Sequence, residues 1–296
     1  MSELKNKIDF LAVVSVKNAN PNGDPLSGNM PRVTNDGLGE ISDVCIKRKI
    51  RNRWMDMGEP VFVQSDDKKT DGCKSLSERV KEQTELAKAQ KEKKKDEFAK
   101  IACGKWLDVR SFGQVFAFKD KKKDEDKDTE GVSVGVRGPV SVHPAFSVDS
   151  VSTASIQITK SVNSETNEKN PDKKSSDTMG MKHRVEFGLY VVKGSINVQL
   201  AEKTGFTEED AEKLKEALRT LFLNDISSAR PDGSMQVHNL YWWKHNCAIG
   251  QYSAAKVHGS VKISLKDGIE EAQSYEDYSI EIEELPGLDV EIINGL

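Results

Sequence analysis

The stretch NPNGDPLSGNMPRVTNDGLGEISDVCIKRKIRNRW, residues 20–54, predicts a turn-rich loop that leads into a basic helix. Three prolines and four glycines make its first half a series of turns. Ser42 is expected to cap the helix, with Asp43 in the first turn, where an acidic side chain suits the helix dipole. Apolar residues recur at helical spacing and predict one buried stripe, formed by Ile46, Ile50, Trp54 and Met57.

The helix is unusually basic, since five of seven consecutive residues in it are cationic. Such a density is unfavourable on a folded helix unless an anion lies against it, and we expect that anion to be a nucleic-acid backbone. At about 100° per residue, Lys47, Arg48 and Arg51 share one side of the helix and are expected to be presented together. Lys49 and Arg53 flank the other side of the apolar stripe. The alternative is a solvated cationic face.

Composition limits the class of protein. The chain has 296 residues, of which 36% are hydrophobic and 31% charged, as is typical of a soluble globular protein with some very polar segments. No apolar run approaches the roughly 20 residues that span a bilayer, and the first residues have no signal-peptide pattern. The four cysteines form no close pair, which favours a reducing compartment over disulfides or a zinc site. We therefore expect a cytoplasmic protein with no membrane partner.

Charge is unevenly distributed along the chain. The formal net charge is -4, but residues 267–296 contain ten acidic residues and no Lys or Arg. The first 266 residues therefore hold 44 basic and 38 acidic residues, a balance of +6. The acidic C-terminal segment is expected to keep the protein soluble, and the alternative is that it pairs with a basic neighbour.

Alternating apolar residues predict the strands of a sheet. Residues 8–17 are apolar on both faces and are expected to form a central strand. Residues 184–200 are predicted to form a hairpin that turns at residues 193–195, because apolar side chains alternate on either side of Lys-Gly-Ser. Further strand-like runs are residues 131–160, 236–244 and 257–265.

A second helix follows the predicted hairpin. Thr207 is expected to cap it, with Asp210 three residues later in a capping-box arrangement. The core order is then strand, helix, strand, loop, strand, strand, helix, strand. This order resembles a ferredoxin-like βαββαβ pattern, so the predicted fold class is α+β in a single domain, residues 1–296. The same topology underlies RNA-recognition modules, whose sheet faces bind single strands.

Two segments interrupt this pattern. Residues 60–131 are predicted to be an insertion into the core fold, with a helical run, strand-like residues 103–118 and a mixed-charge loop tip at residues 119–128. Residues 161–182 are polar and too long for a tight hairpin loop. An ordinary flexible loop is the simpler interpretation of this second segment.

Sequence motifs give no evidence for a cofactor or a metal. There is no GxxxxGK[ST] motif, no GxGxxG followed by a helix, no GxSxG elbow and no Cys/His zinc spacing, so no cofactor is expected. Asp24 and Asp36 lie in the loop before the basic helix, where a carboxylate could hold Mg²⁺ and promote phosphodiester cleavage. The favoured interpretation is that each shapes a turn, at Asn22-Gly23-Asp24-Pro25 and Asn35-Asp36-Gly37.

Several motifs together resemble one known family. They are NPNGDP, the Pro-Arg pair at residues 31–32, SDVCIKRKIRNRW, DVRSFGQVF and VRGPVSV. In this order they resemble the crRNA-binding backbone subunit (Cas-seven family) of type I CRISPR effector complexes, called Cascade, and most of all that of subtype I-C. The resemblance covers nearly the whole chain.

The resemblance implies a fold and a function. The fold would be an RNA-recognition-motif-like palm with an inserted finger segment, residues 60–131, and an inserted thumb, residues 161–182. Copies of the subunit would stack as a helical filament along one CRISPR RNA, and each thumb would press through the duplex of guide and target DNA strand. Further partners would be the large, small and terminal Cascade subunits and a transient nuclease-helicase. The subunit would be non-catalytic, acting in antiviral defence.

The resemblance also implies roles for particular residues. The thumb wedge would be Met179 or Met181. Contacts to the RNA backbone would come from the loop, the basic helix, a glycine-flanked arginine and the thumb base: Asn20, Asn22, Arg32, Lys47, Arg48, Arg51, Arg137, Lys160, His183 and Arg184. Two alternatives stay open. One is a metal-dependent ribonuclease of the same fold that uses Asp24 or Asp36, as the equivalent subunit of type III complexes does with a loop aspartate. The other is a protein-docking module whose basic helix binds an acidic partner.

Overall fold

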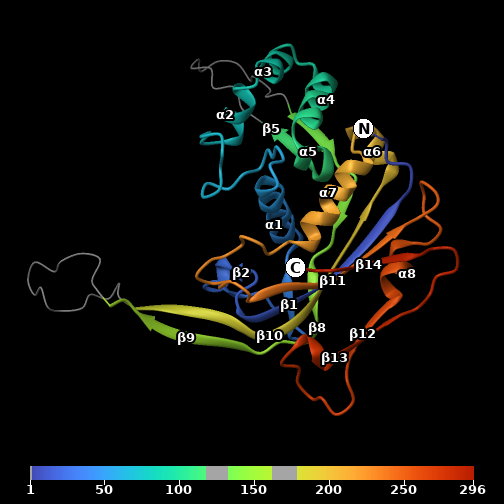
Figure 1. Cartoon of the computed structure of the whole chain (residues 1–296). Helices are drawn as coiled ribbons and strands as arrows, with labels where there is room; N and C mark the ends of the chain where they lie inside the picture. The colour runs from blue at the N-terminus through green and yellow to red at the C-terminus, as the bar shows by residue number, and fades with distance from the viewer. Residues whose placement is uncertain (1, 118–132, 162–178) are drawn as a thin grey trace, which may run out of the picture.

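The main sheet is antiparallel and organises the molecule in the computed structural model, which describes residues 2–117, 133–161 and 179–296 (Figure 1). Its strand order is β14-β11-β1-β10-β8-β4. Two further strands, β7 (Val140–Val142) and β9 (Thr153–Thr159), also pair with β10. The bounds of the six ordered strands are Val290–Asn294, Met235–Lys244, Ile8–Ala19, Met179–Ile196, Ala145–Ser150 and Leu38–Ile41.

The central strand is β1, as predicted. It pairs with β10 on one side and β11 on the other, so all its backbone groups can enter a ladder. Because side chains alternate across a strand, Phe10 and Val14 enter one hydrophobic cluster whereas Leu11 and Val13 enter another on the opposite face. Apolar residues on both faces of β1 therefore reflect a sheet that is covered on both sides.

The predicted hairpin over residues 184–200 is wrong. β10 runs without a turn for 18 residues, and Asn197 then caps α6 (Val198–Thr204). Gly194, placed in the turn by its Lys-Gly-Ser context, instead lies within the strand, where an added Cβ would come 2.2 Å from Cζ of Phe10. Glycine is needed there because an aromatic ring from the neighbouring strand occupies the space.

Two helices cover one face of the sheet at the positions the sequence predicts. Ser42 caps α1 (Asp43–Asp56), and Thr207 with Asp210 forms a capping box at the start of α7 (Glu208–Arg219). Trp54 of α1 is buried and donates its indole N–H to the carbonyl oxygen of Lys213 in α7 at 3.1 Å. The order β1, α1, β8, β10, α7, β11 follows the predicted series except that β10 stands in place of the two strands of the predicted hairpin, and the α+β class is confirmed.

A C-terminal unit covers the other face of the sheet. It consists of α8 (Ala254–Gly259), β12 (Val261–Leu265), a 3-10 turn (Tyr275–Asp277) and β13 (Tyr278–Ile282). Tyr241 and Trp243 of β11 are buried in one cluster with Tyr278 of this unit. The predicted strand over residues 257–265 is therefore wrong in its first part, which is helical. The acidic segment is folded, and among the described residues this unit covers the face of β1 and β11 that an RNA-recognition module would leave open to a single strand.

The inserted segment is mainly helical and has its own apolar cluster. Its elements are α2 (Leu76–Lys81), α3 (Thr84–Lys91), α4 (Lys95–Lys105), α5 (Leu107–Phe112) and β5 (Gly113–Ala117), and β5 pairs with β6 (Ser133–Arg137), which follows the segment. They surround Phe62, Phe98, Trp106 and Phe116, at the top of Figure 1. The strand-like interpretation of residues 103–118 is wrong for the part in α4 and α5. The mixed-charge run at residues 119–128 lies outside the described residues.

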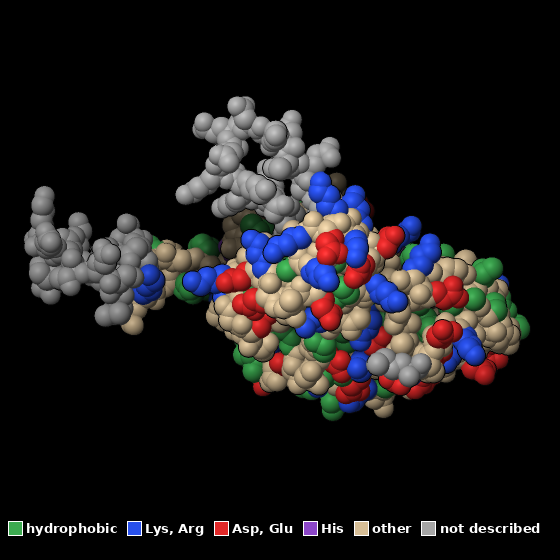
Figure 2. Space-filling model, turned by 90° about the horizontal axis from the view of Figure 1, so that it is seen from above, with side chains coloured by type: hydrophobic (Ala, Val, Ile, Leu, Met, Phe, Trp, Pro, Cys, Tyr) green, Lys and Arg blue, Asp and Glu red, His purple; other side chains and the backbone are tan. Residues whose placement is uncertain are grey.

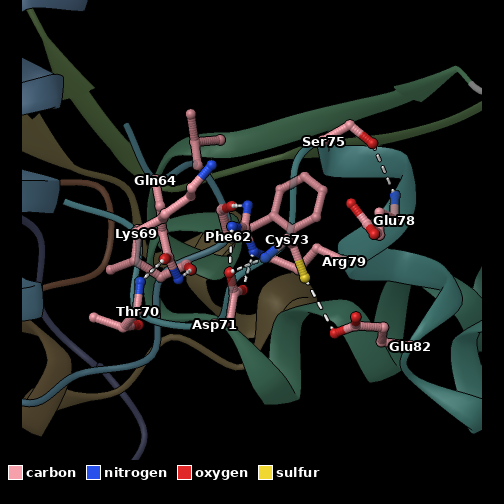
Figure 3. Close-up of polar contacts among 12 residues, drawn as sticks. Phe62, Gln64, Lys69, Thr70, Asp71, Cys73, Ser75, Glu78, Arg79 and Glu82 are labelled. Carbon is pink, nitrogen blue, oxygen red and sulfur yellow. Dashed lines mark hydrogen bonds and ion pairs between the residues drawn. The ribbon is translucent and has the colours of Figure 1, made fainter. Parts of the chain in front are cut away.

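A buried arginine ties the start of this segment together (Figure 3). The guanidinium of Arg79 donates to both carboxylate oxygens of Asp71 and to the carbonyl oxygen of Phe62, the latter at 2.7 Å. The hydrogen bonds from Arg79 hold the pKa of Asp71 down at about 2. Beside them the thiol of Cys73 donates to the carboxylate of Glu82 at 3.1 Å, and this contact and burial raise the pKa of Cys73 to about 11.

No helix among the described residues has the length and apolar character needed to cross a membrane.

Candidate nucleic-acid interface

A groove of about 570 Å³ lies where the loop after β1, the helix α1 and the segment 224–230 meet. The loop forms β2 (Gly23–Asp24), a 3-10 turn (Pro25–Ser27) and β3 (Met30–Pro31), and returns to α1 through β4. The cations that line the groove are Arg32, Arg48, Lys49, Lys68 and Arg230. The sequence thus brings the proline-rich loop and the basic helix to one surface, as predicted.

Asn22 joins the loop to the helix. Its side-chain carbonyl accepts hydrogen bonds from the backbone N–H of Ser42 at 2.9 Å and from the Ser42 hydroxyl at 2.7 Å. The Ser42 hydroxyl in turn accepts from the N–H of Cys45, which caps α1. The buried Asn20 donates its side-chain amide to the carbonyl oxygen of Asn29 at 2.7 Å. Both predicted RNA contacts at these asparagines therefore hold the loop in shape within this chain.

The cations of α1 have partners inside the protein, which the sequence interpretation did not foresee. Four carboxylates, from four parts of the chain, lie against them: Lys47 pairs with Asp43, Arg48 with Asp67, Lys49 with Asp225 and Arg51 with Asp108. Arg53 donates to the hydroxyl of Thr220 at 2.7 Å. The helix therefore needs no external anion to fold, and the three residues Lys47, Arg48 and Arg51 are not equally presented.

These partners differ in how firmly they hold each cation. Arg51 is mostly buried, lies over the ring of Phe112 and donates to Asp108 at 2.9 Å, whereas Arg48 is 54% exposed and reaches Asp67 at 3.5 Å. Exposed pairs contribute little to stability, about 0–1 kcal/mol, so a phosphate can replace the carboxylate of such a pair. Arg48 is therefore available to a ligand and Arg51 is part of the framework.

Burial sets the ionisation of the groove floor. The buried Lys49 has its pKa lowered by burial, which the neighbouring Asp225 partly opposes. Cys45 donates its thiol toward the carbonyl oxygen of Pro21, and burial raises the pKa of that thiol. The floor is thus a protonated thiol beside a buried ion pair, and the accessible charge lies on the rim.

The two loop aspartates behave differently. Asp24 accepts hydrogen bonds from the N–H of Leu26, the hydroxyl of Ser27 and the guanidinium of Arg32 at 3.2, 2.9 and 3.4 Å, so it shapes the turn as the favoured interpretation proposed. Asp36 is exposed in a tight turn that ends at Gly37. Among the residues that the structure describes, no group of three or more His, Cys, Asp or Glu side chains could hold a metal ion.

The predicted thumb begins and ends in a two-stranded arm that projects from the body (Figure 1). Residues 162–178 lie outside the described residues, and residues 179–182 form the start of β10 rather than a loop. Met179 and Met181 are 60% and 56% exposed on the arm. Cross-strand pairing places His183 opposite Ser155, with its Nδ1 2.8 Å from that hydroxyl, and Arg184 opposite Ala154; Lys160 follows the end of β9.

Arg137 lies elsewhere. It ends β6 and lines a different cavity, between the inserted segment and α6, so the structure does not bring it together with the α1 groove.

Three groove residues were missed from the sequence. Lys68 lies in a polar stretch, and Arg230 lies just before the Pro-Asp-Gly turn. Asn52 is an uncharged residue within the basic segment of α1. Arg230 donates to Asp225 at 3.0 Å, and the buried Lys49 donates to the same carboxylate oxygen. No local pattern singles out these side chains, because the segments that carry them are far apart in sequence.

Comparison with known proteins identifies the family. The family model described as "CRISPR-associated protein Cas7" matches residues 6–283. The chain belongs to this Cas7 family. A curated relative, the CRISPR-associated protein Cas7 of Haloferax volcanii (strain ATCC 29605 / DS2), is 29% identical in an alignment of 230 residues that covers 71% of this Cas7-family chain. The match spans 62% of the length of that relative.

Two solved structures have a partly similar backbone. A chain of a "CRISPR RNA-guided surveillance complex, pre-nicking" superposes with a TM-score of 0.48 and 15% identity, covering 80% of the Cas7-family chain and 78% of its own. A chain of a "CRISPR RNA-guided surveillance complex" gives a TM-score of 0.40 and 17% identity, covering 80% and 68%.

Proposed function

We propose that this Cas7-family chain is the non-catalytic backbone subunit of a type I CRISPR effector complex. It oligomerises along CRISPR RNA, binds the phosphate backbone and shapes the duplex between guide and target DNA. The observation that carries the proposal is the family match over residues 6–283, together with a cation-rimmed groove beside the α1 motif.

The groove suits a phosphate backbone because its rim cations form only long ion pairs. Arg32 reaches Asp24 at 3.4 Å, Arg48 reaches Asp67 at 3.5 Å, and Lys68 reaches Asp56 at 3.9 Å. Lys68 also donates to the carbonyl oxygen of Asn224 at 3.0 Å in an exposed hydrogen bond. Charge-assisted bonds to phosphate can replace such contacts between partly or largely exposed groups. We propose Arg32, Arg48 and Lys68 as direct contacts.

Other predicted residues hold the loop and the helix that line the groove in place. Asn20, Asn22 and Arg51 make short contacts within the chain and are proposed to position the loop and helix. Backbone contacts suffice for such a subunit, because Watson–Crick pairing of the guide supplies sequence specificity.

The body is proposed to be an RNA-recognition-motif-like palm. The order β1, α1, β8, β10, α7, β11 and the adjacency β11-β1-β10-β8 support this assignment. Since the C-terminal unit covers the sheet face opposite the helices, we propose that RNA follows the α1 groove at the edge of the sheet. The inserted segment, residues 60–131, would be the finger.

The arm is proposed to be the thumb. Strand alternation places Met179 and Met181 on one face of the arm and Ile156 and Ile158 on the other. Apolar side chains that enter between base steps unstack and kink a duplex. The two methionines, near the end of the described arm, are the proposed wedge. Lys160, which follows Thr159 at that same end, and His183 and Arg184, nearer the body, are proposed to contact the RNA backbone.

Beyond the family, we propose that the chain belongs to subtype I-C and is cytoplasmic. We also propose that it assembles with large, small and terminal subunits, and that this assembly recruits a nuclease-helicase. Co-expression with a CRISPR array and candidate subunits of subtype I-C tests them. Isolation of a single particle with protected guide RNA is expected, and recovery of this chain without RNA or companions would contradict the assignment.

The test of the groove is the salt dependence of RNA binding. If each copy neutralises about 4 to 6 phosphates, the slope of log K against log salt for single-stranded RNA is roughly -3 to -4 per copy. A variant carrying Arg32→Ala, Arg48→Ala and Lys68→Ala should flatten this slope by about 2, because about 0.7 is lost per phosphate contact. The matched control is Lys262→Ala, an exposed cation on β12. An unchanged slope in the triple variant would place the RNA on another surface.

A further inference from the structure

A second, larger cavity lies between α4, β6 and α6. Its volume is about 850 Å³, within the range of sites that enclose a ligand group. Its walls include the apolar side chains of Ala99, Val136 and Leu200, with Lys100, Arg137 and Lys203 among them. Two carboxylates, Asp96 and Glu202, also line the cavity.

Three of the four cations that line this cavity have no ion pair among the described residues, unlike the cations of α1. Arg110, on the cavity wall, donates to both carboxylate oxygens of Asp210 at 2.9 and 2.8 Å and is satisfied. Within the described parts of the chain, no ion pair holds Lys100, Arg137 or Lys203, and none joins them to the two acids. These side chains are exposed, so they can turn toward an anionic group that enters.

The opposite end of the molecule carries a projecting acidic loop. The segment between β12 and β13 reaches the lower end of the molecule in Figure 1, whereas α4 and α6 lie at the upper end. Figure 2 looks down on the upper end and shows Lys and Arg side chains gathered over its centre, with acidic ones interspersed. Residues 266–271 of the loop, Lys-Asp-Gly-Ile-Glu-Glu, are all exposed, and Ile269 is 36% exposed.

We propose that this loop enters the cavity of a second copy of the chain. Ile269 would meet the apolar wall, while Glu270 and Glu271 would meet Lys100 and Lys203. Because the two surfaces lie at opposite ends, the contact is heterologous and joins copies head to tail, with one face free at each end of the row. The inference rests on the proposed function, since it names the surface through which copies bound along one RNA touch.

The charges decide which partner the cavity takes. The loop carries one cation, Lys266, and three acids, Asp267, Glu270 and Glu271, and residues 267–296 contain ten acidic residues and no Lys or Arg, so the net charge of this surface is negative. Opposite charges across such a contact direct encounter and suppress the reverse orientation, in which two acidic ends would meet. A nucleic-acid strand is the competing occupant of the cavity, and the experiment below separates the two.

The test is a charge exchange between the two surfaces. Lys100→Glu with Lys203→Glu reverses the cavity, and Glu270→Lys with Glu271→Lys reverses the loop. Each pair alone should weaken cooperative binding to an RNA that accommodates several copies by about tenfold, and the chain with all four changes should recover most of it. The cooperativity of binding is measured by titrating the RNA with each protein and by counting the copies per RNA by electron microscopy. A loop reversal without effect, or a fourfold variant as weak as the cavity variant, overturns the proposal and favours nucleic acid in the cavity.

A short RNA that accommodates one copy keeps the two hypotheses apart. All four proteins should bind it with equal affinity, because a single copy has no neighbour and neither reversed surface would contact the RNA. If the unmodified protein binds neither RNA, the proposed function is wrong. If it binds both RNAs and the charge reversals do not change binding, only this inference is wrong.

A cross-link provides a second measurement in case a reversal disturbs folding. In a Cys247→Ser background, which removes the exposed native cysteine, Lys203→Cys in one preparation is mixed with Glu270→Cys in another. A disulfide-linked dimer that forms on the long RNA supports the contact. Absence of the dimer, when both proteins bind the RNA, overturns it.

Discussion

Asp108 is a single buried carboxylate that positions two parts of the molecule. It has no exposed surface, and it accepts hydrogen bonds from the N–H groups of Phe62 and Val63 at 2.7 and 3.0 Å and from Arg51 at 2.9 Å. Phe62 begins the core of the inserted segment, and Arg51 lies on α1. A buried ion pair costs several kcal/mol to break when one partner is removed, so we expect Arg51 to position α1 against the inserted segment.

Asp71 provides a prediction about pH at the residue scale. Its pKa is about 2 in the folded protein, below the ordinary 3.8, because Arg79 donates to the ionised form. A lowered pKa means that the carboxylate stabilises the folded state above about pH 4, and that this contribution is lost as the pH falls through 2. The difference in unfolding free energy between the native chain and Asp71→Asn should therefore be constant near neutral pH and shrink between about pH 4 and 2.

Urea denaturation across this pH range measures that difference. Asp66→Asn, at a carboxylate that is 93% exposed, is the matched control and should show a small difference with little change over the same range. A difference for Asp71→Asn that stays constant down to pH 2 would contradict the assigned role of Arg79.

The arm formed by β9 and β10 shows how one element carries two surfaces. Period-two alternation separates a methionine face, which also holds His183, from an isoleucine face, which also holds Arg184. Exposed apolar side chains on both faces of a projecting hairpin are unfavourable in water, which is consistent with an arm that is covered in an assembly. The structure assigns a face to each residue, and this makes a controlled comparison possible.

Replacing both methionines by glutamine tests the wedge. Met179→Gln with Met181→Gln keeps the length of the side chains, and both positions are exposed, so folding and guide binding should be unchanged. Unstacked bases in the target DNA, detected by permanganate oxidation of thymines, should become several-fold less reactive, because a polar side chain does not replace an apolar wedge. The control is Ile156→Gln with Ile158→Gln on the opposite face, which should leave the pattern intact. Equal reactivity in both variants would remove Met179 and Met181 from this role.

At the scale of the whole molecule, the sheet is a layer covered on both sides. Helices α1 and α7 bury one face, and the C-terminal unit buries the other through Tyr278 of β13 and through Leu285 and Leu288, which follow β13. The acidic segment supplies part of this second layer and also the edge strand β14. Its acids lie on the outside of a packed unit, so its first role is structural.

Deleting residues 267–296 should therefore prevent stable folding. The deletion removes β13 and β14 and exposes Tyr241 and Trp243, each of which contributes about 1.5–3 kcal/mol or more when buried. We expect an aggregated product, detected by size-exclusion chromatography. The matched control keeps the packing but lowers the charge, with Glu281→Gln, Glu283→Gln and Glu284→Gln, and should stay folded. If the deletion variant is soluble and unfolds cooperatively, the segment acts only through its charge.

Local sequence determined much of this protein. The Ser42 cap, the capping box of Thr207 and Asp210, the apolar stripe of α1 and the two-sided strand at residues 8–17 were all predicted, because each depends on residues within about four positions or on one period. The motifs around the loop and the basic helix also pointed to the family that the comparison shows.

Tertiary structure alone decided what these local patterns contact. Arg51 pairs with Asp108 at a separation of 57 residues, and Lys49 pairs with Asp225 at a separation of 176 residues. The spacing of residues in the sequence therefore could not predict these counter-ions of α1. Gly194 had the composition of a turn, but it lies in an unbroken strand because a ring from β1 packs against it. Cations, glycines and apolar runs have the same local pattern whichever partner they meet, and only the packing of distant segments selects that partner.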